Sequence, residues 1–310
     1  MSVLTLSFII PVLNGEKYIR DCLEYILREK SAEDEVLVVD NGSTDQTIAI
    51  VQSFGDVLLL QNPGKTISAQ RNFAAAKANG DAFAFIDCDC LVCPGWRQAV
   101  IETLDDDTIH AVGSHYDLSL HPTWVEKAWV PNRHEKPFER KYIPAGNLVI
   151  RNSAYTAING FDESLHTDED TDICRRIIEA GGRLVDHPHA RVMHEGNAKS
   201  VSVFAAKEKW HATSMIASAK KQGLDVPYLF TLLFMGSLLL AVASIVISIG
   251  TGMHIWPLAF LVLFAPVVNA AIKALRNGKL LYFPHLVLLF LVYYWQRSVV
   301  IISGAGRSAR

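Results

Sequence analysis

The stretch FIDCDCLVC, from Phe85 to Cys93, ends an apolar run with two carboxylates spaced one residue apart and three interleaved cysteines. Residue types alone leave three interpretations open. Asp87 and Asp89 are hard oxygen ligands of the kind that suits Mg²⁺ or Mn²⁺. The cysteines could instead form a thiolate site, but a Cys-x-Cys-x-x-Cys zinc site lacks a clear fourth ligand nearby. The third interpretation is a strand that has merely reached solvent.

Apolar runs and amphipathic segments alternate on the N-terminal side of this stretch. The strands are expected at Leu6–Leu13, Glu35–Val39, Val57–Gln61 and Ala82–Ile86, and the helices at Gly15–Lys30, Thr47–Phe54 and Ser68–Asn79. Such alternation predicts an α/β domain, in which helices cover a mostly parallel sheet and ligands bind at the carboxyl ends of the strands.

Polar residues follow the predicted strands where each one ends. The segments are PVLNGE after the first strand, DNGSTD from Asp40 to Asp45 after the second, and DCDC after the fourth. Ser43, Thr44 or Asp45 can serve as the N-cap of the next helix, whereas Asp40 has no capping role of that kind. Asp40 is therefore the expected ligand-binding residue at this edge of the sheet.

Strand geometry also bears on the two carboxylates. Because side chains two residues apart point to the same side of a strand, Asp87 and Asp89 are expected to face one ion, directly or through water. Cys88 and Cys90 would then face into the fold, where a free thiol packs as a small apolar group. The chain has five cysteines in no paired framework, which favours a reducing compartment over a disulfide scaffold.

Composition narrows the setting further. The chain has 310 residues, 50% of them hydrophobic, and a mean hydropathy of +0.20, more than an ordinary soluble domain needs. A net charge of -3 and a pI near 6.4 lack the basic balance of nucleic-acid-binding proteins, so no nucleic-acid partner is expected. The first apolar run has no basic region before it and stops at Pro11, so no cleaved signal peptide is expected.

The C-terminal part is almost continuously apolar and contains three candidate membrane segments. Pro227–Gly250 is uncharged and long enough, at about 1.5 Å per residue, to cross a hydrocarbon core of about 30 Å. Ile255–Ala271, which holds two prolines, and Leu280–Ile302, which holds Arg297, are weaker spans that can instead be buried or interfacial helices. Two to three transmembrane helices are therefore expected in a membrane region of residues 227–303.

The distribution of basic residues predicts the orientation. Lys273, Arg276 and Lys279 lie before the last segment, whereas the loop TGMH between the first two has no Lys or Arg, so the basic loop is expected in the cytoplasm. The N-terminal domain then faces the cytoplasm too, from a multi-pass position in the cytoplasmic (inner) membrane. The segment 199–221 mixes lysines with apolar residues and suits a helix at the headgroup boundary, although a solvent-facing helix stays open.

The N-terminal part contains, in this order, SFIIPVLNGEKYIRDCLEYIL, VLVVDNGSTDQT, ISAQRNFAAAKANGDAFAFIDCD and GFDESLHTDEDTDICRRI. This ordered set resembles family 2 glycosyltransferases, over roughly Leu4 to His194. The resemblance implies a GT-A fold for the domain of residues 1–223, a UDP- or GDP-sugar donor, Mn²⁺ or Mg²⁺, and inversion at the anomeric carbon. It implies a hexosyltransferase-type enzyme that acts on a lipid-linked or saccharide acceptor in glycan or glycolipid synthesis.

The same resemblance assigns roles around the donor. The DCD sequence resembles the family's DxD motif, with Asp89 as the direct metal ligand and Asp87 nearer the ribose and the water shell of the ion. Asp40 resembles the acid that contacts the base, and Arg71 in AQRN resembles the basic residue that reaches the nucleotide. A helix-surface arginine is the alternative for Arg71. The family's first donor loop is matched by Pro11, Asn14 and Glu16.

The acidic segment HTDEDTDICRRI starts at His166 and has the composition of a helix N-terminus stabilised by its dipole. By resemblance, Glu169 and Asp170 match the family's ED motif, in which the Asp deprotonates the acceptor hydroxyl. Asp168 and Asp172 are the substitutes. Such a base is needed because a sugar hydroxyl is a poor nucleophile, whereas the leaving diphosphate needs only charge neutralisation by a metal.

Several further residues are candidates. His194 ends another apolar run, where the family often places a metal-binding histidine, and a hydrogen-bonded structural histidine is the alternative. Processive members carry Gln-x-x-Arg-Trp after the base, but the corresponding segment here is KEKWHA, which argues against a processive synthase. Within it, Lys207, Lys209 and His211 can contact a diphosphate or a lipid phosphate. Asn147 is expected to line the acceptor cleft.

The insert from His115 to Tyr142 lies in sequence between the metal motif and the base. Its Trp124 and Trp129 can stack on sugar faces or simply pack the domain together. Two other functions stay open, a catalytically inactive membrane-anchored scaffold that binds nucleotide sugars and a nucleotidyltransferase. A nucleotidyltransferase would need a Gly-rich basic loop near the N-terminus. A scaffold would not need the aspartates of the donor, metal and base motifs together.

Overall fold

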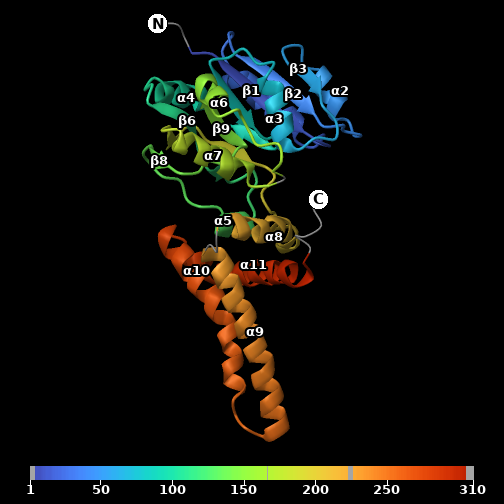
Figure 1. Ribbon diagram of the computed structural model, residues 1–310, viewed down its shortest axis with the longest axis vertical. Coiled ribbons are helices and arrows are strands. Elements are labelled where there is room, and N and C mark those ends of the chain that lie inside the picture. Colours follow the sequence, from blue (N-terminus) through green and yellow to red (C-terminus); the bar gives the residue numbers. More distant parts are fainter. Residues whose placement is uncertain (1–3, 166, 223–225, 305–310) are drawn as a thin grey trace. The chain divides into compact units, whose positions relative to one another are not determined.

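The computed structural model describes residues 4–165, 167–222 and 226–304, and the chain divides into two compact units (Figure 1). The first unit runs to Leu120 and again from Arg133 to Asn197. The second takes His121–Asn132 and the chain from Ala198 onward. The observed division thus differs from the expected boundary near residue 223.

An eight-stranded sheet forms the centre of the first unit, in the order β3-β2-β1-β4-β9-β6-β10-β8. Its strands are β1 (Leu6–Val12), β2 (Glu35–Asp40), β3 (Leu58–Gln61), β4 (Ala82–Ile86), β6 (Ile109–Gly113), β8 (Phe138–Arg140), β9 (Asn147–Arg151) and β10 (Arg183–Asp186). The strands β3, β2, β1 and β4 are mutually parallel, as are β6 and β10, whereas β9 is antiparallel to both of its neighbours. The order reverses around β1, which puts a topological switch point beside the ends of β1, β2 and β4.

Helices cover both faces of this sheet because side chains alternate along its strands. Leu6, Phe8 and Ile10 of β1 belong to one buried cluster and Ile9 to another. The first cluster includes α1 (Ile19–Glu29), α2 (Thr47–Gln52) and α4 (Trp96–Leu104); the second includes α3 (Ile67–Ala75), α6 (Asn152–Ala157) and α7 (Glu169–Glu179). The predicted strand and helix alternation of the first 86 residues is therefore observed, with β4 at the predicted bounds.

A small second sheet is built from β5 (Cys90–Val92), β7 (Tyr116–Asp117) and β11 (Val192–His194). The strand β11 runs antiparallel to β5, and His194 is the register partner of Cys90. This pairing brings the end of β11 next to the turn that joins β4 to β5.

The turn between β4 and β5 corrects one expectation. The strand ends at Ile86, and the N–H of Cys90 donates to the carbonyl of Asp87 at 2.9 Å, so residues 87–89 form a turn rather than an extended strand end. Strand alternation therefore does not set the directions of the two aspartates. Cys90 is fully buried, Cys88 is partly exposed, and all five cysteines are free thiols.

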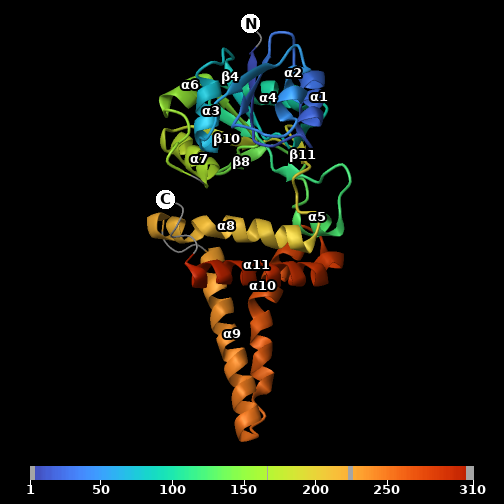
Figure 2. The ribbon, with the colours of Figure 1, turned by 90° about the vertical axis from the view of Figure 1, so that its right-hand side faces the viewer.

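The second unit is helical. It contains α5 (Trp124–Trp129), α8 (Val201–Gln222), α9 (Val226–Thr251), η1 (Trp256–Leu263), α10 (Phe264–Arg276), η2 (Leu280–Tyr282) and α11 (Phe283–Ser303). Within the part of the chain that the structure describes, three runs are long and apolar enough to cross a membrane: Val226–Thr251, Trp256–Arg276 and Leu280–Ser303. Within this unit, α9 and the run η1–α10 form an antiparallel hairpin, while α8 and α11 lie side by side across its end (Figures 1 and 2).

Aromatic packing explains why α5 and α8 belong to this unit. The Trp129 ring lies 4.7 Å from the Phe204 ring of α8 and 5.1 Å from the Phe290 ring of α11, measured between centroids. Glu208 of α8, which is 7% exposed, pairs with Arg297 of α11 at 3.4 Å. Of the two roles expected for Trp129, packing is the one observed, because its ring joins α5 to α8 and α11.

Candidate active site

Asp87 follows β4 directly and contacts residues from three other segments of the chain. Its Oδ1 accepts a hydrogen bond from Arg71 at 2.9 Å, and its Oδ2 accepts one from the Tyr116 hydroxyl at 3.3 Å. The backbone at Gly146 passes so close that an added Cβ would lie 2.2 Å from Asp87 Oδ2 and 2.3 Å from the Tyr116 hydroxyl. Glycine is therefore required at position 146 for this carboxylate to keep its place.

Arg71 joins the two acidic motifs. Its side chain, on α3, is 1% exposed, and its second terminal nitrogen pairs with Glu169 Oε1 at 2.9 Å while the first holds Asp87. The buried guanidinium keeps both of its ion pairs only when the two carboxylates stay in place. Arg71 is thus a bridge between Asp87 and Glu169 rather than a helix-surface arginine, and contact with a nucleotide stays a prediction for it.

The ED motif begins α7. Asp168, at φ 64°, is the residue before the helix, and Glu169 and Asp170 form its first turn; His166 lies outside the described residues. Asp170 Oδ2 accepts a hydrogen bond from the Tyr142 hydroxyl at 2.7 Å, and its Oδ1 accepts one from the Thr171 N–H at 2.8 Å. Burial raises the pKa of Asp170, and the hydrogen bond from Tyr142 opposes that rise.

The two substitutes for Asp170 have other surroundings. Asp168 is exposed, and Asp172 pairs with Arg175 at 2.6 Å and with Arg176 at 2.7 Å. These ion pairs occupy both oxygens of the Asp172 carboxylate. Asp170 is the acid of the segment that combines burial with a neutral donor, which suits a proton acceptor.

Asp89 and His194 meet across the small sheet. Oδ2 of Asp89 lies 3.3 Å from Nε2 of His194, and Cys90 Sγ completes a group whose ligand atoms lie within 4.8 Å of one another. Nδ1 of His194 faces Asn197 Oδ1 at 2.8 Å, and the Asn197 amide is oriented by donating to the Asp117 carbonyl at 2.9 Å. The acceptor on Asn197 makes Nδ1 the protonated nitrogen, so a neutral imidazole turns the lone pair of Nε2 toward the carboxylate.

This arrangement fits a divalent cation. A carboxylate oxygen and a nitrogen lone pair repel each other at such a distance unless a proton or a cation lies between them. An added Cβ at Gly196 would lie 1.9 Å from Asp89 Oδ2, so this glycine leaves the space on which the pair depends. Oxygen and imidazole donors together suit Mn²⁺, and oxygen donors suit Mg²⁺.

The first donor loop and the DNGSTD loop are joined by hydrogen bonds. Asn14 donates its N–H to Ser43 Oγ at 2.8 Å and accepts from the Thr44 N–H at 2.9 Å. Glu16 donates its N–H to Asp45 Oδ2 at 3.1 Å, and its carboxylate accepts from the Gln46 N–H at 3.0 Å. The two loops therefore form one surface at the ends of β1 and β2.

Asp40 has a local role besides the ligand binding expected of it. It is fully buried, and its carboxylate accepts the N–H groups of Gly42 at 2.9 Å and Ser43 at 3.0 Å, which closes the turn after β2. Pro11 is likewise buried within β1, opposite Val39. Both residues shape the donor loops, and direct contact with a nucleotide stays a prediction.

Asn147 does not line an open cleft, which corrects another expectation. Its side chain is fully buried, accepts from Trp96 Nε1 at 2.9 Å and donates to the carbonyls of Ser114 at 3.1 Å and Ala190 at 2.9 Å. All of its amide groups are thus used within the fold. The predicted phosphate-contacting residues Lys207, Lys209 and His211 lie on α8, in the second unit, and their role stays a prediction.

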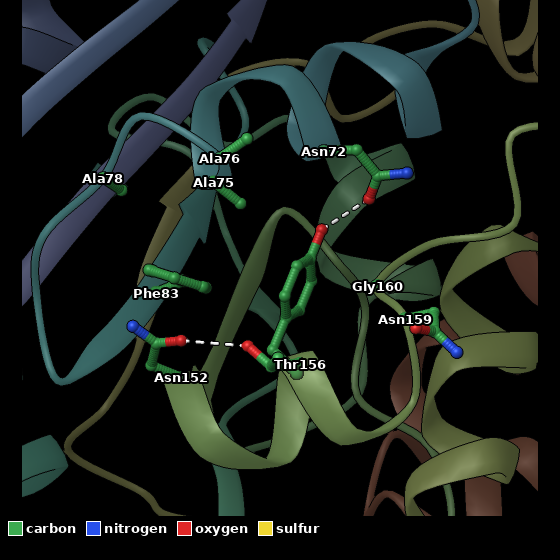
Figure 3. Close-up of a pocket in the computed structure, with 10 residues that line it drawn as sticks. Asn72, Ala75, Ala76, Ala78, Phe83, Asn152, Thr156, Asn159 and Gly160 are labelled. Carbon is green, nitrogen blue, oxygen red and sulfur yellow. Dashed lines mark hydrogen bonds between the residues drawn. The ribbon is translucent and has the colours of Figure 1, made fainter.

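A pocket of about 420 Å³ lies between α3 and α6 (Figure 3). Its polar side chains bond to each other: the Tyr155 hydroxyl donates to Asn72 Oδ1 at 2.5 Å, and the Thr156 hydroxyl donates to Asn152 Oδ1 at 3.1 Å. It contains none of the predicted site residues.

Sequence reasoning missed the residues that orient the acids. Tyr142, Tyr116 and Asn197 each come from a segment without a recognisable motif. The two tyrosines contact residues far away in sequence, whereas Asn197 contacts the nearby His194. The Tyr116 ring also stacks on His194, with centroids 4.3 Å apart. Asn197, three residues after the candidate histidine, was the one that spacing alone could have suggested.

Comparison with known proteins places this geometry in a family. The family described as "Glycosyl transferase family 2" matches residues 7–160. The pre-mycofactocin glycosyltransferase of Mycobacterium tuberculosis is 29% identical over 262 residues, which cover 80% of this chain and 53% of that protein. Glycosyltransferase AglE of Haloferax volcanii is 26% identical over 57% of this chain and 62% of its own. The chain spans about half the length of the first of these relatives.

Solved structures share the fold. The mannosyltransferase PcManGT of Pyrobaculum calidifontis, in complex with GDP-Man and Mn²⁺, has a TM-score of 0.61 at 18% identity and covers 96% of this chain and 86% of its own. TarS of S. aureus in complex with UDP-GlcNAc has a TM-score of 0.53 at 17% identity and covers 97% and 92%. The expected GT-A fold, followed by apolar helices, is confirmed. Through residues 7–160, which begin in β1 and include the turn of residues 87–89 between β4 and β5, the chain contains a glycosyl transferase family 2 domain.

Proposed function

We propose that this protein is an inverting, metal-dependent glycosyltransferase that moves a sugar from a UDP- or GDP-sugar to a lipid-linked or saccharide acceptor at the membrane. The observation that carries the proposal is the pair of ion pairs made by Arg71, which joins the aspartate turn after β4 to the first turn of α7. The segments that would bind the metal and carry the base, far apart in sequence, are thereby joined, as transfer to an acceptor would require.

Asp89 and His194 would hold Mn²⁺ or Mg²⁺, with Asp87 nearer the ribose. When bound, the ion would neutralise the charge that develops on the leaving diphosphate. The two hydrogen-bonded loops that carry Asn14 and Asp40 would bind the nucleotide at the ends of β1 and β2. Open α/β sheets bind such ligands at this position. The solved relatives with GDP-Man or UDP-GlcNAc support this class of donor.

Asp170 would act as the base. The acceptor oxygen forms a bond to the anomeric carbon as the bond to the diphosphate breaks, and the hydroxyl proton passes to the Asp170 carboxylate. One base and no protein nucleophile give a single displacement, which inverts the anomeric centre. Burial raises the pKa of Asp170, so its affinity for that proton exceeds that of an exposed carboxylate.

The first test uses the full-length protein in detergent, with UDP-GlcNAc, UDP-glucose or GDP-mannose as donor and a membrane-lipid extract as acceptor. We expect release of nucleoside diphosphate that needs Mn²⁺ or Mg²⁺ and stops with a chelator. Asp170→Asn should keep donor binding but lower transfer by about 10² to 10⁴. Asp168→Asn and Asp172→Asn are matched controls and should lower it far less. Loss at a control with full activity in Asp170→Asn would assign the base elsewhere, and no transfer by the unmodified protein with any donor would favour a scaffold.

We propose further that the second unit crosses the membrane twice, through α9 and the run η1–α10, and that α11 lies along the surface beside α8. Glu208 of α8 and Arg297 of α11 form an ion pair at 3.4 Å, and α8 also carries Lys207 and Lys209. If α11 crossed the bilayer, this charged neighbour would enter the hydrocarbon, at about 2.5–3.5 kcal/mol for each charge. The basic end of α10, at Lys273, would then face the cytoplasm together with the catalytic unit.

A further inference from the structure

Tyr142 touches the candidate base directly. Its hydroxyl donates to Asp170 Oδ2 at 2.7 Å, while Asp170 Oδ1 accepts from the backbone N–H of Thr171 at 2.8 Å. One hydrogen bond on each oxygen fixes the plane of the carboxylate and leaves a second lone pair on each oxygen for an incoming proton. Because Thr171 is the next residue on the same helix, Tyr142 is the hydrogen-bond donor among the described residues that ties the Asp170 side chain to another segment of the fold.

The segment that carries Tyr142 is itself held firmly. It follows β8, which pairs antiparallel with β10 so that Arg140 is opposite Leu184. Asp186, the last residue of β10, is 1% exposed and pairs with His134 Nε2 at 2.6 Å and with Arg140 Nε at 2.8 Å. The buried carboxylate therefore fastens the chain two residues before Tyr142 to the edge of the main sheet.

Asp170 sits among several charged or titratable groups. Glu169 precedes it, Arg71 lies on the far side of Glu169, and the thiol of Cys174, one turn further along α7, bonds to the Ile143 carbonyl at 3.5 Å. Burial raises the pKa of Asp170 and the Glu169 carboxylate raises it further, whereas the hydrogen bond from Tyr142, the Thr171 N–H and the Arg71 charge lower it. Tyr142 is the strongest of the lowering influences.

We propose that Tyr142 is a positioning residue that holds the Asp170 carboxylate in one orientation and stabilises its ionised form ahead of proton transfer; this inference rests on the proposed function. The phenol keeps its own proton throughout, because burial beside a carboxylate raises the pKa of Tyr142. The proton of the acceptor hydroxyl is taken up by Asp170, and Tyr142 takes part in no bond that forms or breaks.

The test is the dependence of kcat on pH in full-length Tyr142→Phe, with the donor that the unmodified enzyme uses among UDP-GlcNAc, UDP-glucose and GDP-mannose. Loss of the hydrogen bond to the charged Asp170 carboxylate should raise the pKa of Asp170. The acidic limb of the profile of kcat against pH should therefore move up by about one pH unit. On that limb kcat should fall about tenfold, the rates should converge at higher pH, and KM for the donor should stay unchanged. A role in folding alone would lower the amount of active enzyme equally at every pH.

Tyr155→Phe is the matched control, because it removes a hydroxyl that donates to Asn72 Oδ1 at 2.5 Å, away from the base. The acidic limb of the kcat–pH profile of Tyr155→Phe should match that of the unmodified enzyme. Should Tyr142→Phe fail to fold, a monofluorinated tyrosine at position 142 keeps the ring and makes the phenol a stronger donor, so it should move the limb to lower pH.

The possible failures are distinguishable. If Asp170→Asn is inactive but both Tyr142 variants titrate like Tyr155→Phe, the positioning role is wrong and the proposed base stands. If Asp170→Asn retains full turnover, or the unmodified protein transfers no sugar, the proposed function itself fails, whatever position 142 does.

Discussion

Asn197 shows how one uncharged side chain can decide the chemistry of a charged pair. Its Oδ1 accepts from His194 Nδ1 at 2.8 Å, so that Nε2, which lies 3.3 Å from Asp89 Oδ2, becomes the nitrogen with the lone pair. A histidine released from such a partner rotates and adopts either tautomer. Asn197 would thus prepare His194 as a metal ligand without touching the ion.

We therefore expect Asn197→Ala to weaken Mn²⁺ binding by about 10- to 100-fold. Electron paramagnetic resonance of free Mn²⁺ during a titration measures this. Asn152→Ala, which removes an amide that donates to the Gly80 carbonyl at 3.2 Å, is the control and should bind as the unmodified protein does. Equal affinities in the two variants would mean that His194 is a structural histidine.

Individual residues were predictable where a motif fixes both residue type and place. The aspartates after β4 and at the start of α7 could be predicted from their motifs. The residue type of an asparagine, by contrast, does not indicate whether it lies in a cleft or in the core. Asn147 is fully buried because Trp96, Ser114 and Ala190 come from three other segments to meet its amide. Contacts of that kind depend on tertiary packing, which local sequence does not encode.

At the scale of elements, an ion pair links α4 to the start of β2. Asp34, 4% exposed, accepts from Arg97 Nε at 2.5 Å and from the N–H groups of Ser31 at 2.7 Å and Leu6 at 2.9 Å. Burial by itself raises the pKa of Asp34, but the hydrogen bonds from Arg97 and from these two N–H groups outweigh it, so the pKa is lowered. The ionised form is thus favoured by the folded state.

Asp34→Asn should therefore lower the free energy of unfolding by about 3 kcal/mol near neutral pH, since it leaves the guanidinium unpaired. Because the folded pKa is below the unfolded value of about 3.9, the stabilisation is present above that value and is lost as pH falls through the folded pKa. Thermal unfolding followed by tryptophan fluorescence measures it. Asp56→Asn, at an exposed position, is the control, and an equal loss of stability in both would contradict the role of the pair.

The periodic elements were predictable and their non-local pairing was not. Alternating apolar residues gave β4 at its observed bounds, and α1 starts at Ile19 rather than Gly15 because the Gly15 carbonyl accepts from Tyr18 and Ile19 in a preceding turn. The strand β9, by contrast, enters the middle of the sheet antiparallel to β4 and β6. The five residues of β9 alone do not specify which strands it will pair with or in which direction.

At the scale of the whole molecule, the two-span arrangement predicts where three positions face. Reporter fusions at Thr251 and Asn277 should lie on opposite sides of the membrane, with Asn277 in the cytoplasm. A fusion after Ser303 should lie on the same side as Asn277 if α11 follows the membrane surface beside α8, as proposed. Activity of paired reporters, one active only in the cytoplasm and one only outside it, measures this. A fusion after Ser303 on the outer side would make α11 a third span.

The chain passes between the two units at three places, after Leu120, after Asn132 and after Asn197. The catalytic unit therefore cannot be cut free at one site, because α5 remains in the packing of the helical unit through Trp129. Cleavage after Asn197 should leave the two fragments associated in detergent, as seen by size-exclusion chromatography. A chain that stops at Asn197 should aggregate through its uncovered α5, unless residues 121–132 are replaced by a short polar linker. A soluble, monomeric truncation that keeps α5 would show that these aromatic contacts do not hold the fragments together.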